Sequence, residues 1–155
     1  MSAHRDAGQS TDQSTGQSTG RRSRHELVNP DRLAPAVGFS HAVVATPGRT
    51  VYLGGQTAQR GDGTIAGETV KEQFDLALAN LVTAVRAVGG EPEHLVSMIV
   101  YTTDAAGYRA GLRELGAIYR RHFGRHYPAM AFFEVKGLFD PAATIELVGT
   151  AVIPD

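Results

Sequence analysis

Glu146 is the residue whose position in the sequence best fits a chemical role. It lies within residues 143–153, a run of β-branched and small apolar residues that is typical of a buried strand. A carboxylate inside such a strand stays charged at low cost only beside a cation, several hydrogen-bond donors or a water-filled cleft. Charges held in this way are often kept for chemistry. The alternative is an edge strand on which Glu146 points into solvent.

The remaining chemical candidates are histidines, because the chain has six histidines and no cysteine. Without cysteine, disulfides, thiolate catalysis and zinc–thiolate sites are excluded. His122 and His126 have the spacing of a helical metal site, but Gly124 interrupts the helix and no third ligand is placed. Ser40 and His41 lack the strand-turn-helix context of a catalytic serine. We therefore expect no metal site.

Residues 127–130, with the sequence Tyr-Pro-Ala-Met, lead into a second apolar strand. Pro128 fixes the entry to this strand. Met130 has two interpretations, since methionine commonly fills gaps in cores. It is either part of the core or, if its strand adjoins that of Glu146, part of a pocket wall beside the carboxylate.

Strand and turn signals predict how the chain begins to fold. Two short apolar runs, 41–45 and 49–53, flank Pro47-Gly48 and predict a β-hairpin. Gly54 and Gly55 then end the second strand. Because glycine has no side chain, another backbone or a ligand can approach closely there.

Helix signals are clear over the middle of the chain. Thr69 and Glu72 fit a capping box, and apolar residues recur every three or four positions until Gly89-Gly90 ends the helix. Further strands over 95–102, 129–135 and 144–153, and a second helix over 106–122, give the order β-β-α-β-α-β-β. This order predicts an α+β fold with one mixed sheet and two helices on one face. The uncovered apolar face predicts an oligomer.

Composition indicates one folded domain after a polar extension. Residues 1–26 repeat a Gly/Gln/Ser/Thr-rich tetrad and predict a disordered segment before a domain over 27–155, whose ordered part begins near Leu33. The arginines of the second helix, Arg109, Arg113, Arg120 and Arg121, indicate a solvated face. A net charge of −1 predicts no nucleic-acid partner. No segment approaches the roughly 20 apolar residues that cross a bilayer. We expect no membrane partner and a cytoplasmic location.

Several short motifs, taken together, resemble the Rid family of reactive-intermediate deaminases, also called the YjgF or L-PSP family. They are Gly38-Phe39-Ser40-His41-Ala42, Gly54-Gly55-Gln56, Gln73 with Asn80, Val100-Tyr101-Thr102-Thr103-Asp104, Tyr119 with Phe123, Tyr127-Pro128-Ala129 and Ile145-Glu146. They run in order over nearly the whole domain. The resemblance implies a chorismate-mutase-like homotrimer with clefts between subunits. Deaminating members hydrolyse enamines and imines there to ketones and ammonia, without a metal or organic cofactor.

The same resemblance implies the site residues. Glu146 matches the catalytic glutamate that positions water, and the expected substrate-binding residues are Phe39, Gly55, Gly116, Tyr127, Met130 and Phe132. The family arginine that holds the substrate carboxylate is replaced by Met130, which has no donor. Phe39 stands where the family has tyrosine, and Gly116 where it often has asparagine.

We therefore expect a divergent member that hydrolyses or binds an enamine- or imine-type metabolite other than the usual 2-aminoacrylate-type substrate. The alternative is a non-catalytic protein on the same trimeric scaffold that binds a small metabolite or takes part in an interaction.

Overall fold

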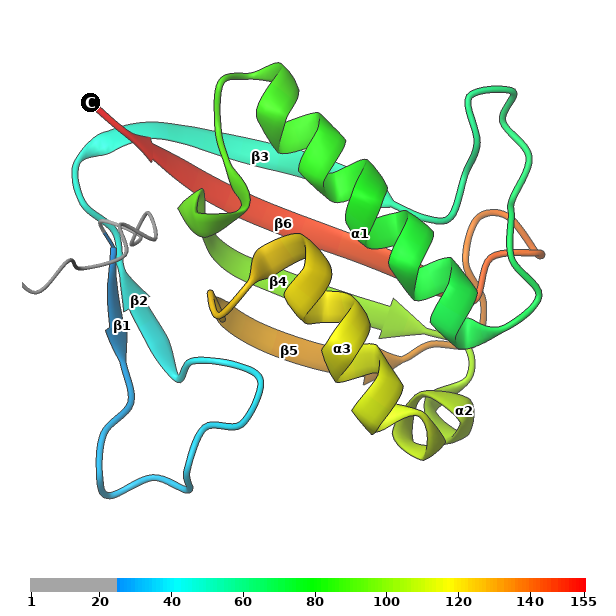
Figure 1. The fold of residues 1–155 in the computed structure, drawn as a ribbon, viewed down its shortest axis with the longest axis horizontal. Coiled ribbons are helices and arrows are strands. Elements are labelled where there is room, and N and C mark those ends of the chain that lie inside the picture. The colour runs from blue at the N-terminus through cyan, green and yellow to red at the C-terminus, as the bar shows by residue number, and fades with distance from the viewer. Residues whose placement is uncertain (1–24) are drawn as a thin grey trace, which may run out of the picture.

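The computed structural model describes residues 25–155, which form a mixed sheet covered on one face by helices (Figure 1). The sheet has the order β3-β6-β4-β5, formed by β3 (Gly48–Gln56), β6 (Ile145–Pro154), β4 (Leu95–Thr102) and β5 (Ala129–Glu134). β4 pairs in parallel with β5, and the other pairs are antiparallel. Helices α1 (Val70–Ala87) and α3 (Leu112–Phe123) lie on one face. The predicted α+β class, with a mixed sheet covered by helices on one face, is confirmed.

The capping box at the start of α1 is confirmed. The Thr69 hydroxyl accepts a hydrogen bond from the Glu72 amide at 3.2 Å, and the Glu72 carboxylate accepts from the Thr69 amide at 3.1 Å. The helix ends at Ala87, and Gly89 follows with φ of 84°, a left-handed conformation that favours glycine. The apolar stripe of α1 packs on the sheet through Phe74, Leu78, Leu81 and Val85.

The second predicted helix is in fact two helices, α2 (Ala105–Ala110) and α3, which meet at Gly111. Asp104 caps α2 by accepting a hydrogen bond from the Gly107 amide at 2.8 Å. The prediction of a single helix over 106–122 was therefore wrong. Glycine has a low helix propensity, so interrupting the helix at Gly111 costs little free energy, and the chain changes direction there.

The predicted hairpin between 41–45 and 49–53 was also wrong. β2 (Ala42–Val44) pairs with β1 (Glu26–Val28) in a separate two-stranded sheet, while β3 pairs with β6. The nine residues of β3 find a ten-residue partner in β6, whereas β2 offers only three. The longer ladder satisfies more backbone groups.

The ordered part begins earlier than Leu33. His25 is buried, and its Nε2 lies 2.8 Å from the Val152 carbonyl oxygen. The expected extension over 1–26 lies outside the described residues except for His25 and Glu26. A short 3-10 helix, η1 (Pro92–His94), precedes β4. No helix in the described part of the chain is long and apolar enough to cross a membrane.

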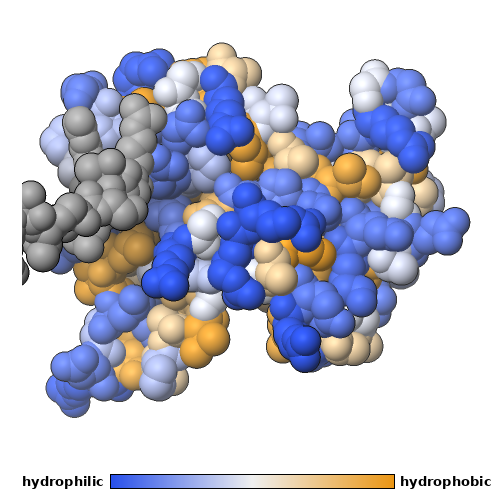
Figure 2. Space-filling model, in the orientation of Figure 1, coloured by the Kyte–Doolittle hydropathy of each residue, from blue (hydrophilic) through white to orange (hydrophobic). Residues whose placement is uncertain are grey.

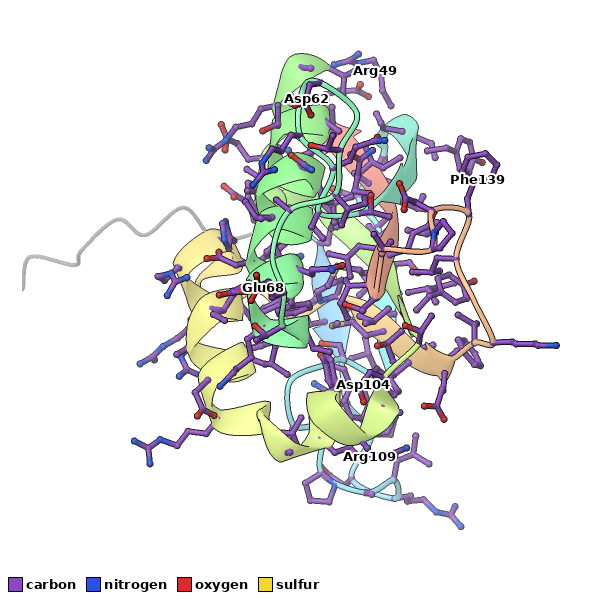
Figure 3. All side chains as sticks on the ribbon, turned by 90° about the vertical axis from the view of Figure 1, so that its right-hand side faces the viewer. Arg49, Asp62, Glu68, Asp104, Arg109 and Phe139 are labelled. Carbon is purple, nitrogen blue, oxygen red and sulfur yellow. The ribbon has the colours of Figure 1, made fainter. Side chains whose placement is uncertain are left out.

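The two faces of the sheet differ in what covers them. Met98 and Val100 of β4 are buried beneath the helices, whereas Ile99 and Tyr101 point to the other face and are half-buried. Within residues 25–155 no helix covers this second face, which we call the open face. Figure 3 shows the helices on one side of the sheet and Phe139, in the β5–β6 loop, projecting on the other.

Candidate functional site

A pocket of about 650 Å³ opens between the loop before β2, helices α2 and α3, and strand β5. It is lined mainly by Val37, Phe39, Phe74, Val100, Tyr108, Arg109, Leu112, Leu115, Gly116, Tyr119, Arg120, Tyr127, Met130 and Phe132. The surface has a notch between the loop before β2 and the α3 side of the molecule (Figure 2). Of the predicted substrate-binding residues, all but Gly55 line this pocket.

Hydrogen bonds from Ser40 hold the loop in position. Its amide donates to the Pro128 carbonyl at 2.9 Å, and its hydroxyl donates to the Tyr127 carbonyl at 2.6 Å. Because Ser40 is buried against the entry to β5, the neighbouring Phe39 is directed to the pocket. The motif around Ser40 thus serves the pocket by positioning its wall.

Aromatic rings form one side of the pocket. Tyr119 and Tyr127 stack with ring centroids 5.1 Å apart, and Tyr108 packs on Phe132 at 4.7 Å. The Tyr119 hydroxyl donates to the His126 carbonyl at 2.7 Å. Burial raises the pKa of both Tyr119 and Tyr108, so these hydroxyls stay neutral near pH 7. This side of the pocket is therefore neutral and mainly apolar.

Met130 and Glu146 lie on opposite faces of the sheet and on strands that are not neighbours, so within one chain Met130 does not form a pocket wall beside the Glu146 carboxylate, the second of its two interpretations. β4 runs between β5 and β6, and its Tyr101 pairs with Glu146 on one side and Phe133 on the other. Met130 pairs with Met98, which faces the helices. Because side chains alternate along a strand, Met130 joins the helix face and Glu146 joins the open face.

Gly55 lies directly against Glu146. A Cβ atom on Gly55 would overlap Oε1 of the carboxylate. Glu146 is half-buried, and among residues 25–155 its side chain has no ion-pair or hydrogen-bond partner. The carboxylate is thus free to accept hydrogen bonds from a water or a ligand on the open face.

Two arginines of the pocket were not predicted from the sequence. Arg109 of α2 and Arg120 of α3 are exposed, as the solvated-face interpretation requires, yet both line the pocket. Arg121 instead pairs with Asp75 at 2.8 Å. The available signal was the spacing of Gly116 and Arg120, because residues four apart on a helix share a face.

The two histidines with metal-site spacing contact different partners. His122 lies 2.6 Å from an oxygen of Asp75, and buried His126 lies 2.7 Å from the Leu95 carbonyl oxygen. Burial lowers the pKa of His126. Over the described residues, no three His, Asp or Glu side chains are grouped so that they could hold a metal ion.

The family model described as Endoribonuclease L-PSP matches residues 29–153. This chain belongs to that family. A protein of the conserved Rid family from Yersinia pestis, YyfB, is 31% identical and has a TM-score of 0.76, with 83% of this chain and 98% of that chain covered. The resemblance to the Rid family is therefore confirmed.

Two further solved structures resemble this L-PSP family member. RidA from the Antarctic bacterium Psychrobacter sp. PAMC 21119 is 25% identical, with a TM-score of 0.59 over 83% of this chain and 99% of that chain. A putative endoribonuclease from Thermotoga maritima is 27% identical, with a TM-score of 0.60 over 82% and 93%. No curated protein sequence matches the chain.

Proposed function

We propose that this Rid-family protein binds an imine- or enamine-type metabolite and hydrolyses it to a carbonyl compound and ammonia. The reaction takes place in a cleft that two copies of the chain share. The supporting observation is that an apolar pocket lies on the helix face, whereas Glu146, whose side chain has no partner among residues 25–155, lies on the open face. Each copy supplies the pocket of one cleft and the carboxylate of another.

Glu146 activates water in this proposal. Its carboxylate accepts a proton as the water oxygen bonds to the imine carbon, which gives a carbinolamine. Proton transfer to the nitrogen then allows the C–N bond to break, so that ammonia leaves and the carbonyl forms. An enamine first takes up a proton at carbon and loses one from nitrogen, which gives the imine. No redox partner is needed.

The shared cleft is supported by the character of the open face. Ile99 and Val148 on it are half-buried, and Tyr52 is 83% exposed, so the face carries apolar surface that a second copy would cover. A closed symmetric ring brings the same two surfaces together at every contact. We propose the homotrimer that the Rid resemblance implies.

Met130 makes the usual 2-aminoacrylate-type compounds poor substrates in this proposal. The thioether has no hydrogen-bond donor, so β5 offers no anchor for a substrate carboxylate. The mainly apolar lining around Met130 instead suits a larger organic body.

The test is imine hydrolysis by purified protein. Amino-acid oxidase generates imines in situ, and carbonyl formation is followed against the uncatalysed rate. We expect the wild type to accelerate hydrolysis and Glu146→Gln to lower kcat about 100-fold, since general-base groups supply ~10²–10⁴-fold. Glu114→Gln is the control, because Glu114 is an exposed carboxylate on α3.

If the wild type binds imine analogues but accelerates no imine, hydrolysis is contradicted, and the chain is a metabolite-binding protein on the same scaffold. The physical reason for that outcome would be that Met130, which has no hydrogen-bond donor, replaces the family arginine that holds the substrate. Equal rates for the wild type and Glu146→Gln would remove Glu146 from the mechanism.

A further inference from the structure

The guanidinium of Arg120 lies across Gly116 at the wall of the pocket. Its Nη1 atom is 3.3 Å from the position that a Cβ on Gly116 would take. Long side chains on a helix lean toward its N-terminus, over the residue four positions earlier. Because Gly116 has no side chain, Arg120 can follow the helix surface back to the pocket while remaining exposed to solvent.

Neither pocket arginine is neutralised within the described chain. Over residues 25–155, Arg109 and Arg120 form no ion pair and no side-chain hydrogen bond, whereas Arg121 is bound by Asp75 at 2.8 Å. A guanidinium carries five N–H donors. These donors are available to a ligand at the pocket mouth. Figure 3 shows Arg109 on α2, one of the helices that border the pocket.

The interior of the pocket has the opposite character. Phe39, Met130 and Phe132 contribute apolar surface, and the Tyr119 hydroxyl is already bonded to a backbone carbonyl. A volume of about 650 Å³ falls within the range of sites that enclose a drug-sized ligand. The pocket thus combines a large apolar interior with a cationic mouth.

We propose that Arg120, with Arg109 at the same rim, binds the carboxylate of a ligand whose bulky apolar body fills the pocket over Met130 and Phe132. Arginine can bind a carboxylate through two parallel hydrogen bonds, which fixes the orientation of the ligand. The identity of the reacting group rests on the proposed function: the substrates are imines of 2-amino acids with large apolar side chains. Arg120 supplies the donors that Met130 lacks.

Stable carbonyl compounds test this binding mode without turnover. Phenylpyruvate has both a carboxylate and an aromatic body, phenylacetone lacks the carboxylate, and pyruvate lacks the body. Calorimetry on the full-length protein should give tightest binding for phenylpyruvate. Arg120→Gln should weaken phenylpyruvate about tenfold or more, as expected for hydrogen bonds to a charged group, and leave phenylacetone unchanged.

Two variants on α3 complete the experiment. Arg113→Gln is the matched control, since Arg113 is an exposed arginine on the same helix that does not line the pocket. It should bind all three compounds as the wild type does. Arg120→Lys keeps the charge but loses the planar fork, so its affinity for phenylpyruvate should fall between those of the wild type and Arg120→Gln.

Several results would overturn the inference: no binding of phenylpyruvate by the wild type, unchanged affinity in Arg120→Gln, or an equal loss for phenylacetone. The proposed function fails separately. Arg120-dependent binding without imine hydrolysis contradicts only the hydrolase. Glu146-dependent hydrolysis with phenylpyruvate binding insensitive to Arg120 contradicts only the role of Arg120.

Discussion

Gly55 controls the space around the Glu146 carboxylate. The glycine ends a glycine pair in β3, at the irregularity between Leu53 and Gln56 where the pairing register with β6 shifts. Its missing side chain leaves room for Glu146 Oε1. Gly55 therefore determines where the carboxylate of Glu146, the proposed general base, can lie, although Gly55 has no side chain to take part in the reaction.

Gly55→Ala should lower the kcat of imine hydrolysis about 10- to 100-fold, because the added Cβ forces the carboxylate out of position. Gly54→Ala is the control, since a Cβ there meets no atom within 4 Å. Steady-state kinetics, with circular dichroism to verify folding, would measure both variants. Equal activities of the two variants would show that this position of Glu146 is irrelevant to the reaction.

Helix α1 organises the approach to β6 as well as the core. Its buried Gln73 donates to the Ala142 carbonyl at 2.9 Å and accepts from the Thr144 amide at 2.8 Å. These bonds hold the segment that leads directly to Glu146. Gln73, one of the residues that resemble the Rid family, is thus a positioning residue in this fold.

The capping box should make a measurable contribution to the stability of the whole domain. Thr69→Ala removes the side-chain acceptor of the Glu72 amide and should lower the free energy of unfolding by about 1 kcal/mol. Thr83→Ala is the control, because Thr83 is exposed on the same helix and bonds only to the Ala79 carbonyl. Urea denaturation would compare the variants. A loss for Thr83→Ala as large as that for Thr69→Ala would contradict the capping role.

At the scale of the whole molecule, the sheet separates the two halves of the proposed site. The pocket opens beside β5 on the helix face, and Glu146 lies on β6 on the open face, with β4 between the strands. One chain cannot bring both to the same ligand without unfolding its sheet. Assembly is therefore a condition of activity in our proposal.

Mixed oligomers test this sharing. Gly116→Phe, which fills the pocket mouth, and Glu146→Gln should each have low activity, but oligomers reassembled from both should recover full activity at about a quarter of sites. The native mass should be three times the chain's 16.5 kDa. Mixing Glu146→Gln with Gly55→Ala, which damages the same half, is the control and should show no gain over the average of the two separate variants. Recovery in neither mixture would contradict a shared cleft.

Much of the fold follows from signals that operate over a few residues. The capping box at Thr69, the stop at Gly89 and the entry at Pro128 depend on backbone groups one turn away, so their sequence patterns sufficed. The resemblance to the Rid family also named five residues that the structure brings together at the pocket: Phe39, Gly116, Tyr127, Met130 and Phe132. Gly111 was missed because a single glycine leaves the helical periodicity on both sides intact.

The amino-acid sequence by itself determined the long helix α1, most of the strands of the mixed sheet, the α+β class and the residues worth testing. Tertiary structure alone decided that β2 pairs with β1 and that Met130 and Glu146 face opposite ways. It also brought Arg120 to the pocket. The physical reason is that strand pairing joins residues far apart in the chain, and a one-residue change of register reverses every face. Which side chains meet is therefore a property of the assembled sheet.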